Sequence, residues 1–304
     1  MLLSKWLRQL LYSSIFLLFA APVWAASCCG GGFAVPSIIT GDDKAQVTTS
    51  LSYSKIDTDV LANGEWYKRN SNDTTQLYKM EFSHIFGDRF QVGATLPVQM
   101  HTRDGAAGGT STGLADVSAQ LGYEFLPDWN YNPIRPKGVG FLAITLPTGK
   151  SIYESTDGLD SRGRGFLSIG AGAVFTKNWI TWDANSSIEF HHSFSKVISN
   201  SEMLGTIEPG NGGSFSLGAG YNMGDTRLGS SIAWTVEDAI NVTGSSPSTG
   251  SDQRYATGSL LVSQMFDNLW AATVSYSDQT LFGEPNNATL SKTISLSLQK
   301  RWAR

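Results

Sequence analysis

One stretch near the carboxyl end decides the fold: Thr293-Ile294-Ser295-Leu296-Ser297-Leu298-Gln299-Lys300-Arg301-Trp302. Its residues Ile294, Leu296, Leu298 and Trp302 share one parity, whereas Thr, Ser, Gln and Arg side chains occupy the other. This two-residue period predicts a β-strand with one apolar and one polar face. The apolar face covers a core in a soluble sheet, but it meets lipid in a membrane barrel. The rest of the chain has to distinguish these two environments.

The composition favours the barrel. The chain has 304 residues, of which 32 are glycine, 11% are aromatic and 16% are charged. Soluble domains usually carry about a quarter of charged residues. The mean hydropathy of −0.13 excludes a bundle of membrane helices. A barrel has this combination because its strands alternate apolar and polar positions.

The first 25 residues have the pattern of a cleaved secretory signal peptide. Lys5 and Arg8 supply a basic start, residues 10–21 an apolar centre, and Val23-Trp24-Ala25 the small residues before a cleavage site. A retained membrane anchor is the alternative, but the apolar run is short for a spanning helix. Cleavage removes two of the 22 basic residues and none of the 26 acidic ones, which leaves a net charge of −6. We therefore expect an exported protein with no nucleic-acid partner.

We expect residues 26–42 to form a flexible periplasmic segment and residues 43–304 to form the outer-membrane barrel. Cys28 and Cys29 are adjacent and are the only cysteines, so they build neither a disulfide framework nor a cysteine metal site. Ala26-Ser27-Cys28 weakly resembles a lipoprotein box but lacks its usual leucine. Lipidation of Cys28 stays an open alternative.

The alternation of apolar and polar residues predicts about 12 strands. They cover residues 45–53, 75–86, 89–101, 116–125, 138–146, 165–176, 179–194, 214–223, 227–236, 254–266, 269–277 and 293–302. Strand 138–146 is apolar on both parities, so the pattern does not orient it. Pro97 predicts a strand end or a bulge because proline lacks an N–H for the ladder.

The connections alternate between about two residues and about ten to seventeen, with 128–136 as the one misfit. Outer-membrane barrels have this arrangement, with short periplasmic turns and long external loops. A secreted β-sandwich or a soluble propeller has no reason to keep its long loops at one end. We therefore predict an all-β, transmembrane, antiparallel up-and-down β-barrel. Lipid forbids open sheet edges, so the first strand has to pair with the last.

Three short motifs carry a resemblance to a known family: Gly113-Leu114-Ala115-Asp116-Val117, Gly122-Tyr123-Glu124-Phe125 and Leu146-Pro147-Thr148-Gly149-Lys150. They resemble Gram-negative outer-membrane proteins that are catalogued as transporters of the phenol meta-degradation pathway and grouped with porin-like barrels. The resemblance implies an outer-membrane β-barrel with an uptake role. The last strand also resembles the signal read by the barrel-assembly machinery, although Ala303 and Arg304 follow its terminal aromatic residue.

If the apolar faces meet lipid, the opposite parity lines the lumen. That parity carries Lys79, Glu81, Asp116, Gln120, Glu124, Asp183, Asn185, Glu189, His191, Arg227 and Glu237. These groups either pair with one another and stabilise a hydrated interior, or form a slightly acidic conduit for cations and neutral polar solutes. On the apolar faces, Trp182, Trp234, Trp270 and Trp302 are expected in the aromatic girdles at the lipid interfaces.

Two other functions remain as alternatives. In one of them, side chains or residues 26–42 plug the lumen, and the barrel is structural or adhesive. In the other, His191 and Ser193 form a lipid hydrolase, because Glu189, His191 and Ser193 occupy i, i+2 and i+4 on one strand face. Against the hydrolase, no nucleophile elbow is present, and this parity points to the lumen instead of the lipid.

We therefore predict an outer-membrane channel or uptake porin for small molecules, with passive diffusion through or beside a polar, slightly acidic lumen. No histidine pair has ligand spacing with an acid, and the glycine-rich residues 105–113 lack the Lys-Ser/Thr of a phosphate loop. We expect no metal, no cofactor and no enzymatic activity. The expected partners are outer-membrane lipid, the barrel-assembly machinery and an unidentified small solute.

Overall fold

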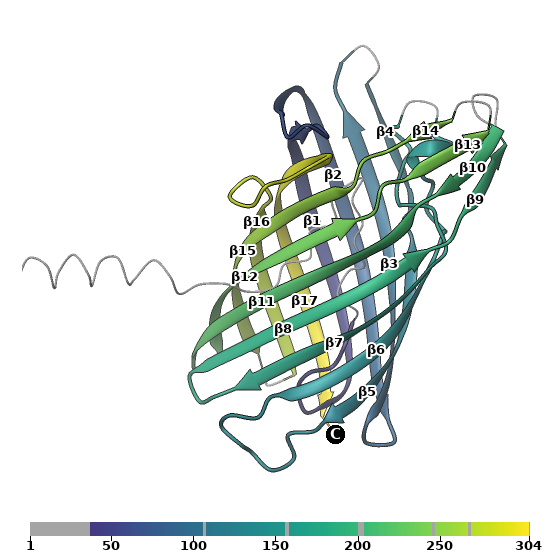
Figure 1. Ribbon diagram of the computed structural model, residues 1–304. Helices are drawn as coiled ribbons and strands as arrows, with labels where there is room; N and C mark the ends of the chain where they lie inside the picture. The colour runs from purple at the N-terminus through teal and green to yellow at the C-terminus, as the bar shows by residue number, and fades with distance from the viewer. Residues whose placement is uncertain are drawn as a thin grey trace, which may run out of the picture.

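The computed structural model describes residues 37–105, 108–155, 158–199, 204–244, 247–266 and 269–303. Its wall strands are β1 (Asp43–Val60), β2 (Trp66–Phe86), β3 (Phe90–Arg103), β5 (Val117–Leu126), β6 (Lys137–Leu146), β7 (Ser168–Asn178), β8 (Trp182–Ser193), β11 (Gly210–Met223), β12 (Thr226–Glu237), β15 (Gln253–Phe266), β16 (Trp270–Asp278) and β17 (Ala288–Ala303). They pair antiparallel in the order β2-β1-β17-β16-β15-β12-β11-β8-β7-β6-β5-β3. Pairing of β2 with β3 closes the ring (Figure 1), which confirms the predicted 12-stranded barrel.

The first and last strands close the barrel as expected. Along this seam Leu51 faces Leu296 and Ser52 faces Ser295 in an antiparallel register. The polar parity points inward, where the Ser295 hydroxyl donates to Ser52 Oγ at 2.8 Å. Thr293 is 1% exposed, whereas its neighbour Ile294 is 58% exposed on the outer face. The apolar parity of the last strand therefore faces the lipid side.

The same division into two faces runs around the wall. Large apolar side chains such as Phe82, Leu121, Phe190 and Val262 are exposed on the outside, whereas buried polar side chains line the inside. On β2 the alternating outward apolar side chains begin at Tyr78, and residues 68–76 carry none, so this part of the strand extends beyond the lipid-facing wall; Trp66 and Tyr67 at its start are exposed as well. Within the described residues, no helix has the length and apolarity needed to cross a membrane.

Several expected external loops are instead paired strand. Residues 57–73, expected as a polar connection, continue β1 and β2 and leave only 61–65 as the turn. Residues 109–114 form β4 (Gly109–Leu114), which pairs with the outer half of β3. Polar residues on both faces hide the strand alternation here, because these extensions have water on both sides. The alternation of apolar and polar residues therefore predicts only the lipid-facing part of these strands.

Pro97 lies where β3 changes partners. Residues 90–95 of β3 pair with β5, and residues 98–103 pair with β4. The partner strand is interrupted at this point, and the carbonyl of Pro97 accepts the N–H of Ala115 at 3.0 Å. The predicted irregularity at Pro97 is therefore a break in the facing strand.

A second, smaller sheet continues the wall beyond the barrel. It contains β9 (Lys196–Ser199), β10 (Leu204–Glu208), β13 (Asn241–Gly244) and β14 (Ser248–Thr249), in the order β14-β13-β10-β9 (Figure 1). The sequence pattern predicts loops for the two segments that form this sheet, residues 196–212 and 237–252. Ile198, Ile207 and Val242 of this sheet pack on Phe166, which lies in the connection between β6 and β7 and is 2% exposed. This apolar cluster anchors that connection to the extended wall.

The structure orients strand 138–146, which the sequence left open. Val139, Phe141 and Ala143 point into the barrel, where they form a cluster with Val174 and Ile38. The other parity, including Leu142, is exposed on the outside. Both faces are apolar because one meets lipid and the other meets a chain segment inside the lumen.

We expect Leu296→Arg to lower the free energy of unfolding by about 2–4 kcal/mol, because it places a charge on the lipid side near the middle of the last strand. Urea titration of the barrel in phospholipid vesicles, followed by its heat-modifiable gel mobility, measures this change. Leu296→Met is the matched control and should cost less than about 1.5 kcal/mol. Equal effects of the two variants would contradict a lipid-facing position.

Candidate functional site

The described end of the amino-terminal segment lies inside the lumen. The carbonyl of Ser37 accepts the hydroxyl of Ser83 at 2.6 Å and the amide of Gln120 at 3.0 Å. Ile39 donates its N–H to Gln91 Oε1 at 2.7 Å and accepts from Gln91 Nε2 at 3.3 Å. Side chains of β2, β3 and β5 thus make the hydrogen bonds that a neighbouring strand would otherwise make with the backbone of this segment. The segment in turn narrows the lumen.

A cavity of about 410 Å³ remains beside this segment, lined by residues of β1, β2, β7, β8, β11, β12 and β17. Hydroxyl and amide groups dominate its lining, with three apolar members, Ile38, Val174 and Ala184. Its polar lining includes Thr48, Asn178, Asn185, Ser187, Ser216 and Gln299. The space that is left in the lumen is therefore hydrophilic.

The charged candidates that were expected in the lumen lie on the inner face, and most of them are paired. The pairs are Lys79–Glu81 at 3.1 Å, Lys137–Glu124 at 3.2 Å and Arg227–Asp183 at 2.6 Å. Arg227 binds Asp183 through two parallel hydrogen bonds, a geometry that fixes both side chains. Gln120 holds Ser37 instead of a solute, and Asn185 lines the cavity. Pairing cancels much of the acidic excess that the sequence suggested.

The connection between β6 and β7 forms the extracellular end of the site. We name its described residues, 147–155 and 158–167, the mouth loop; it contains the short 3₁₀ helix η2 (Ile152–Glu154). Asp116, at the break between β4 and β5, accepts the N–H of Gly149 at 2.9 Å and that of Gly165 at 3.0 Å. One carboxylate therefore joins both ends of the mouth loop to the wall.

Close packing around Asp116 explains two of the three resembled motifs. Thr148 donates its hydroxyl to the carbonyl of Ala115 at 2.6 Å and accepts the N–H of Val117 at 3.0 Å. A Cβ atom on Gly163 would lie 2.5 Å from Asp116 Cγ, so only glycine fits there. The segments around residues 113–117 and 146–150 thus form a single clamp on the mouth loop.

The mouth loop reaches opposite walls of the barrel. On one side His101 of β3 contacts the carbonyl of Leu159 at 3.0 Å. On the other side Arg164 donates to Glu237 of β12 at 2.6 Å and lies 3.1 Å from His191 Nε2. β3 and β12 are six strands apart in the closed ring of 12. The mouth loop therefore crosses the extracellular end of the lumen.

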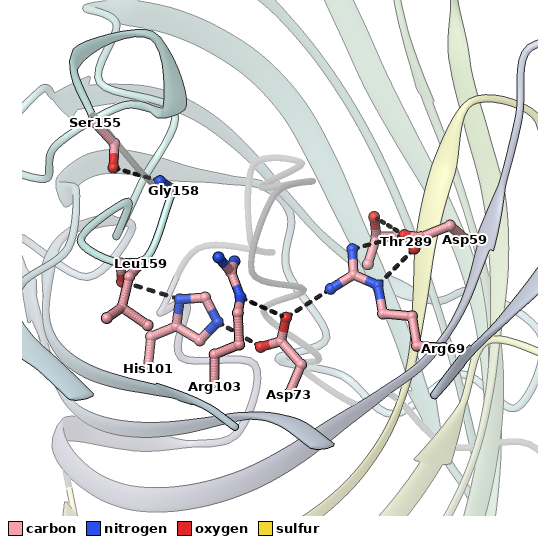
Figure 2. A network of polar contacts seen from close by, with 9 residues as sticks. All are labelled: Asp59, Arg69, Asp73, His101, Arg103, Ser155, Gly158, Leu159 and Thr289. Carbon is pink, nitrogen blue, oxygen red and sulfur yellow. Dashed lines mark hydrogen bonds and ion pairs between the residues drawn. The ribbon is translucent and has the colours of Figure 1, made fainter. Parts of the chain in front are cut away.

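A buried carboxylate organises the β3 side of the mouth (Figure 2). Asp73, 1% exposed, lies 2.5 Å from His101 Nε2, 2.6 Å from Arg69 Nη1 and 3.4 Å from Arg103 Nε. Arg69 also binds Asp59, with Nε 2.5 Å from Oδ2. Burial by itself would raise the pKa of Asp73, but the hydrogen bond from His101 and the charges of His101, Arg69 and Arg103 hold it below its ordinary value. Asp73 is therefore ionised at neutral pH.

The residues of the hydrolase alternative have other partners. His191 Nδ1 lies 3.0 Å from Glu189, and Nε2 lies 3.1 Å from Glu237. The hydroxyl of Ser193 shares a hydrogen bond of 2.7 Å with Ser168. Both nitrogens of the imidazole thus face carboxylates, and Ser193 lies inside the barrel, away from lipid. In the part of the chain that the structure describes, no group of three or more His, Cys, Asp or Glu side chains could hold a metal ion.

The four tryptophans that were predicted for the aromatic girdles all lie on the outer face. Trp182 packs on Tyr221 with 4.7 Å between ring centroids, and Trp234 stacks on Phe215 at 5.9 Å. Lys300 Nζ lies 5.0 Å from the ring centroid of Trp270 and 5.3 Å from that of Trp302. A cation over two rings near the chain end is the arrangement expected where lipid tails meet phosphate headgroups.

The sequence pattern does not identify several site residues. Asp73 lies in the polar stretch 57–73, and Arg164 lies between a predicted loop and the predicted strand 165–176. His101 ends the predicted strand 89–101, and nothing in the sequence indicates which carboxylate it meets 28 residues away. The glycines at 149, 163 and 165 near Asp116 were the available signal. The predicted signal peptide, Cys28 and most of segment 26–42 lie outside the described residues.

Comparison with solved structures finds similar barrels. One is the COG4313 outer membrane channel from Pseudomonas putida F1, with 13% sequence identity, 90% of this chain and 100% of that chain covered, and a TM-score of 0.70. Another is the transport unit of the autotransporter AIDA-I from Escherichia coli, with 9% identity, coverage of 90% and 94%, and a TM-score of 0.50. No protein-family model matches the chain, and no curated protein matches it. The fold is that of an outer-membrane β-barrel.

We expect Asp116→Asn to loosen the mouth loop. Asparagine keeps only one acceptor oxygen, so its amide would face the N–H of Gly149 or Gly165 and leave one of them unsatisfied. Tryptic cleavage within the mouth loop of the folded barrel should become about tenfold faster. Asp225→Asn, at an exposed turn, is the control and should leave the cleavage rate unchanged. An unchanged rate in Asp116→Asn would refute the clamp.

Acid should weaken the β3 side of the mouth. The folded-state pKa of Asp73 lies below its ordinary value of 3.8. Ionised Asp73 therefore stabilises the fold above that value, and this contribution is lost as the pH falls through the folded-state pKa. We expect Asp73→Asn to cost about 1–3 kcal/mol at pH 7 and less below about pH 3. Thermal unfolding in detergent, compared with exposed Asp88→Asn, measures this; a pH-independent cost would contradict it.

Proposed function

We propose that the protein is a passive outer-membrane channel for small polar molecules. The observation that carries the proposal is the hydrophilic cavity of about 410 Å³ beside residues 37–40. Buried inside a barrel, hydroxyl and amide groups replace the hydrogen bonds that a solute loses with its water shell. A lumen without such a space would have no room for a solute.

The lining of the cavity favours neutral or weakly charged hydrophilic solutes. Its charged members include Arg227 and Asp183, which neutralise each other at 2.6 Å. An apolar solute would find few apolar side chains there. The resemblance of the sequence motifs to phenol-pathway transporters also supports uptake, and a small phenolic compound has the hydroxyl group that this lining can bind. The name of the similar Pseudomonas putida protein supports a channel as well.

A plugged, structural barrel is the second candidate. Its specific support is the amino-terminal segment, which is buried in the lumen and held by side chains of β2, β3, β5 and β6. Planar-bilayer conductance separates the two functions. A channel gives single-channel currents and swelling of liposomes in small sugars, whereas a plugged barrel gives neither.

We expect the pair Arg227–Asp183 to set ion preference, because each residue neutralises the other beside the cavity. Asp183→Asn leaves a cationic Arg227 and should shift the K⁺/Cl⁻ permeability ratio toward chloride by about two- to fivefold. Arg227→Gln should shift it toward potassium. Reversal potentials measured in a salt gradient give the sign of each shift in the permeability ratio. Asp225→Asn is the control. Shifts of the same sign would place the pair outside the conduction path.

A further inference from the structure

We propose that His101 positions the mouth loop across the lumen, and that it does so only while its imidazole ring carries both N–H protons. The consequence for conductance rests on the proposed channel function. The positioning itself does not, since it concerns the contact between β3 and the mouth loop.

The two acceptors on either side of the ring fix its protonation (Figure 2). Nδ1 lies 3.0 Å from the carbonyl oxygen of Leu159, and Nε2 lies 2.5 Å from Asp73 Oδ1. A carbonyl oxygen has no proton to donate, and an ionised carboxylate has none either. Both hydrogen bonds exist together only if each ring nitrogen is the donor. The contact to the mouth loop therefore requires the imidazolium form.

The proton belongs to His101 and not to Asp73. The second oxygen of Asp73 accepts Arg69 Nη1 at 2.6 Å and lies 3.4 Å from Arg103 Nε. These two guanidinium groups stabilise the carboxylate form, which in turn stabilises the cation on the other side of it. A neutral Asp73 would lose both charge-assisted contacts.

The charged groups around the ring come from several elements. They are Asp59 of β1, Arg69 and Asp73 of β2, Arg103 of β3, and Lys150, Asp160 and Arg162 of the mouth loop. Facing His101 on β4 is the neutral Ser111, which accepts from Arg162 at 2.8 Å. Asp59 and Asp73 balance Arg69 and Arg103, and Asp160 balances Lys150.

Loss of the proton breaks the contact to the mouth loop first. A neutral ring has one N–H, which can face either Asp73 or Leu159. If the bare nitrogen faced Asp73, its lone pair would meet a full negative charge at 2.5 Å. If it faced Leu159, it would meet only a carbonyl dipole at 3.0 Å. The ring therefore keeps Asp73 and releases Leu159.

The released part is the tip of the mouth loop. Gly158 donates its N–H to Ser155 Oγ at 2.8 Å, and Ser155 donates to Asp160, so this turn is held by its own contacts. The base of the loop stays fixed by Asp116, which makes no contact with His101. Deprotonation thus removes the contact between His101 and Leu159 and loosens the mouth loop at β3, while Asp116 and the contact of Arg162 with Ser111 of β4 still hold it to the wall.

The test compares wild type with His101→Gln, whose amide does not titrate. Tryptic cleavage after Lys150 or Arg162 of the folded barrel is followed between about pH 6 and pH 9 and normalised to a peptide substrate at each pH. We expect cleavage of the wild type to rise about tenfold with pH, and that of His101→Gln to stay flat. ¹⁵N chemical shifts of labelled histidine should show both His101 nitrogens protonated at the low end.

His191→Gln and His192→Gln are the matched controls, since His191 contacts Arg164 of the mouth loop and His192 is exposed outside. Both should keep the wild-type pH profile. A rise with pH that persists in His101→Gln, or one that disappears only in His191→Gln, would overturn the proposal.

Bilayer conductance is the second arm. It should rise with pH in the wild type and not in His101→Gln. A pH-dependent cleavage profile without any current would keep the role of His101 and reject the proposed channel. Current in the wild type, together with a cleavage rate that does not change with pH, would keep the proposed channel and reject the role of His101.

Discussion

The structure depends on one constraint: inside lipid, no strand may leave its backbone N–H and C=O groups unpaired. A sheet meets this condition only by closing on itself, so the register between β1 and β17 is as important as any side-chain contact. Closure also assigns the two parities of every strand. Once Leu296 faces outward opposite Leu51, the serines beside them have to face inward. The apolar exterior and the polar interior are thus two consequences of one hydrogen-bonded ring.

Closure at 12 strands leaves more interior than wall side chains can fill. A barrel of about eight strands is just filled by its own side chains. Here the extra volume is occupied from both ends. Residues 37–41 lie in the lumen near the end where β1 begins, and the mouth loop covers the opposite end. Charged pairs such as Arg227–Asp183 occupy part of the remainder, and because they are paired, the interior tolerates them without a large electrostatic cost.

Alternation along the strands was enough to predict the barrel, because each lipid-spanning strand is sorted by two different solvents. It failed in three places. Residues 68–75 carry no apolar side chain, and the short strands β9, β10, β13 and β14 bury only single apolar side chains such as Ile198, Ile207 and Val242, so neither region shows an extended alternation. Strand 138–146 is apolar on both faces, since Ile38 covers the inner one. The site was harder to predict, because the partners of Asp116, Asp73 and His101 are brought together by the ring and not by sequence spacing.

The cavity and the mouth loop have part of the wall in common. The amino-terminal segment binds β2, β3, β5 and β6, and the cavity beside it is lined by residues of β1, β2, β7, β8, β11, β12 and β17. Farther along β8 and β12 lie the buried side chains of Glu189, His191 and Glu237, and Arg164 of the mouth loop binds Glu237. Gly212 permits this cluster: a Cβ atom there would lie 2.1 Å from Glu237 Oε2 and 2.6 Å from His191 Nε2. The charged cluster and the hydroxyl-lined cavity therefore share β8 and β12, with the buried cluster nearer the mouth loop.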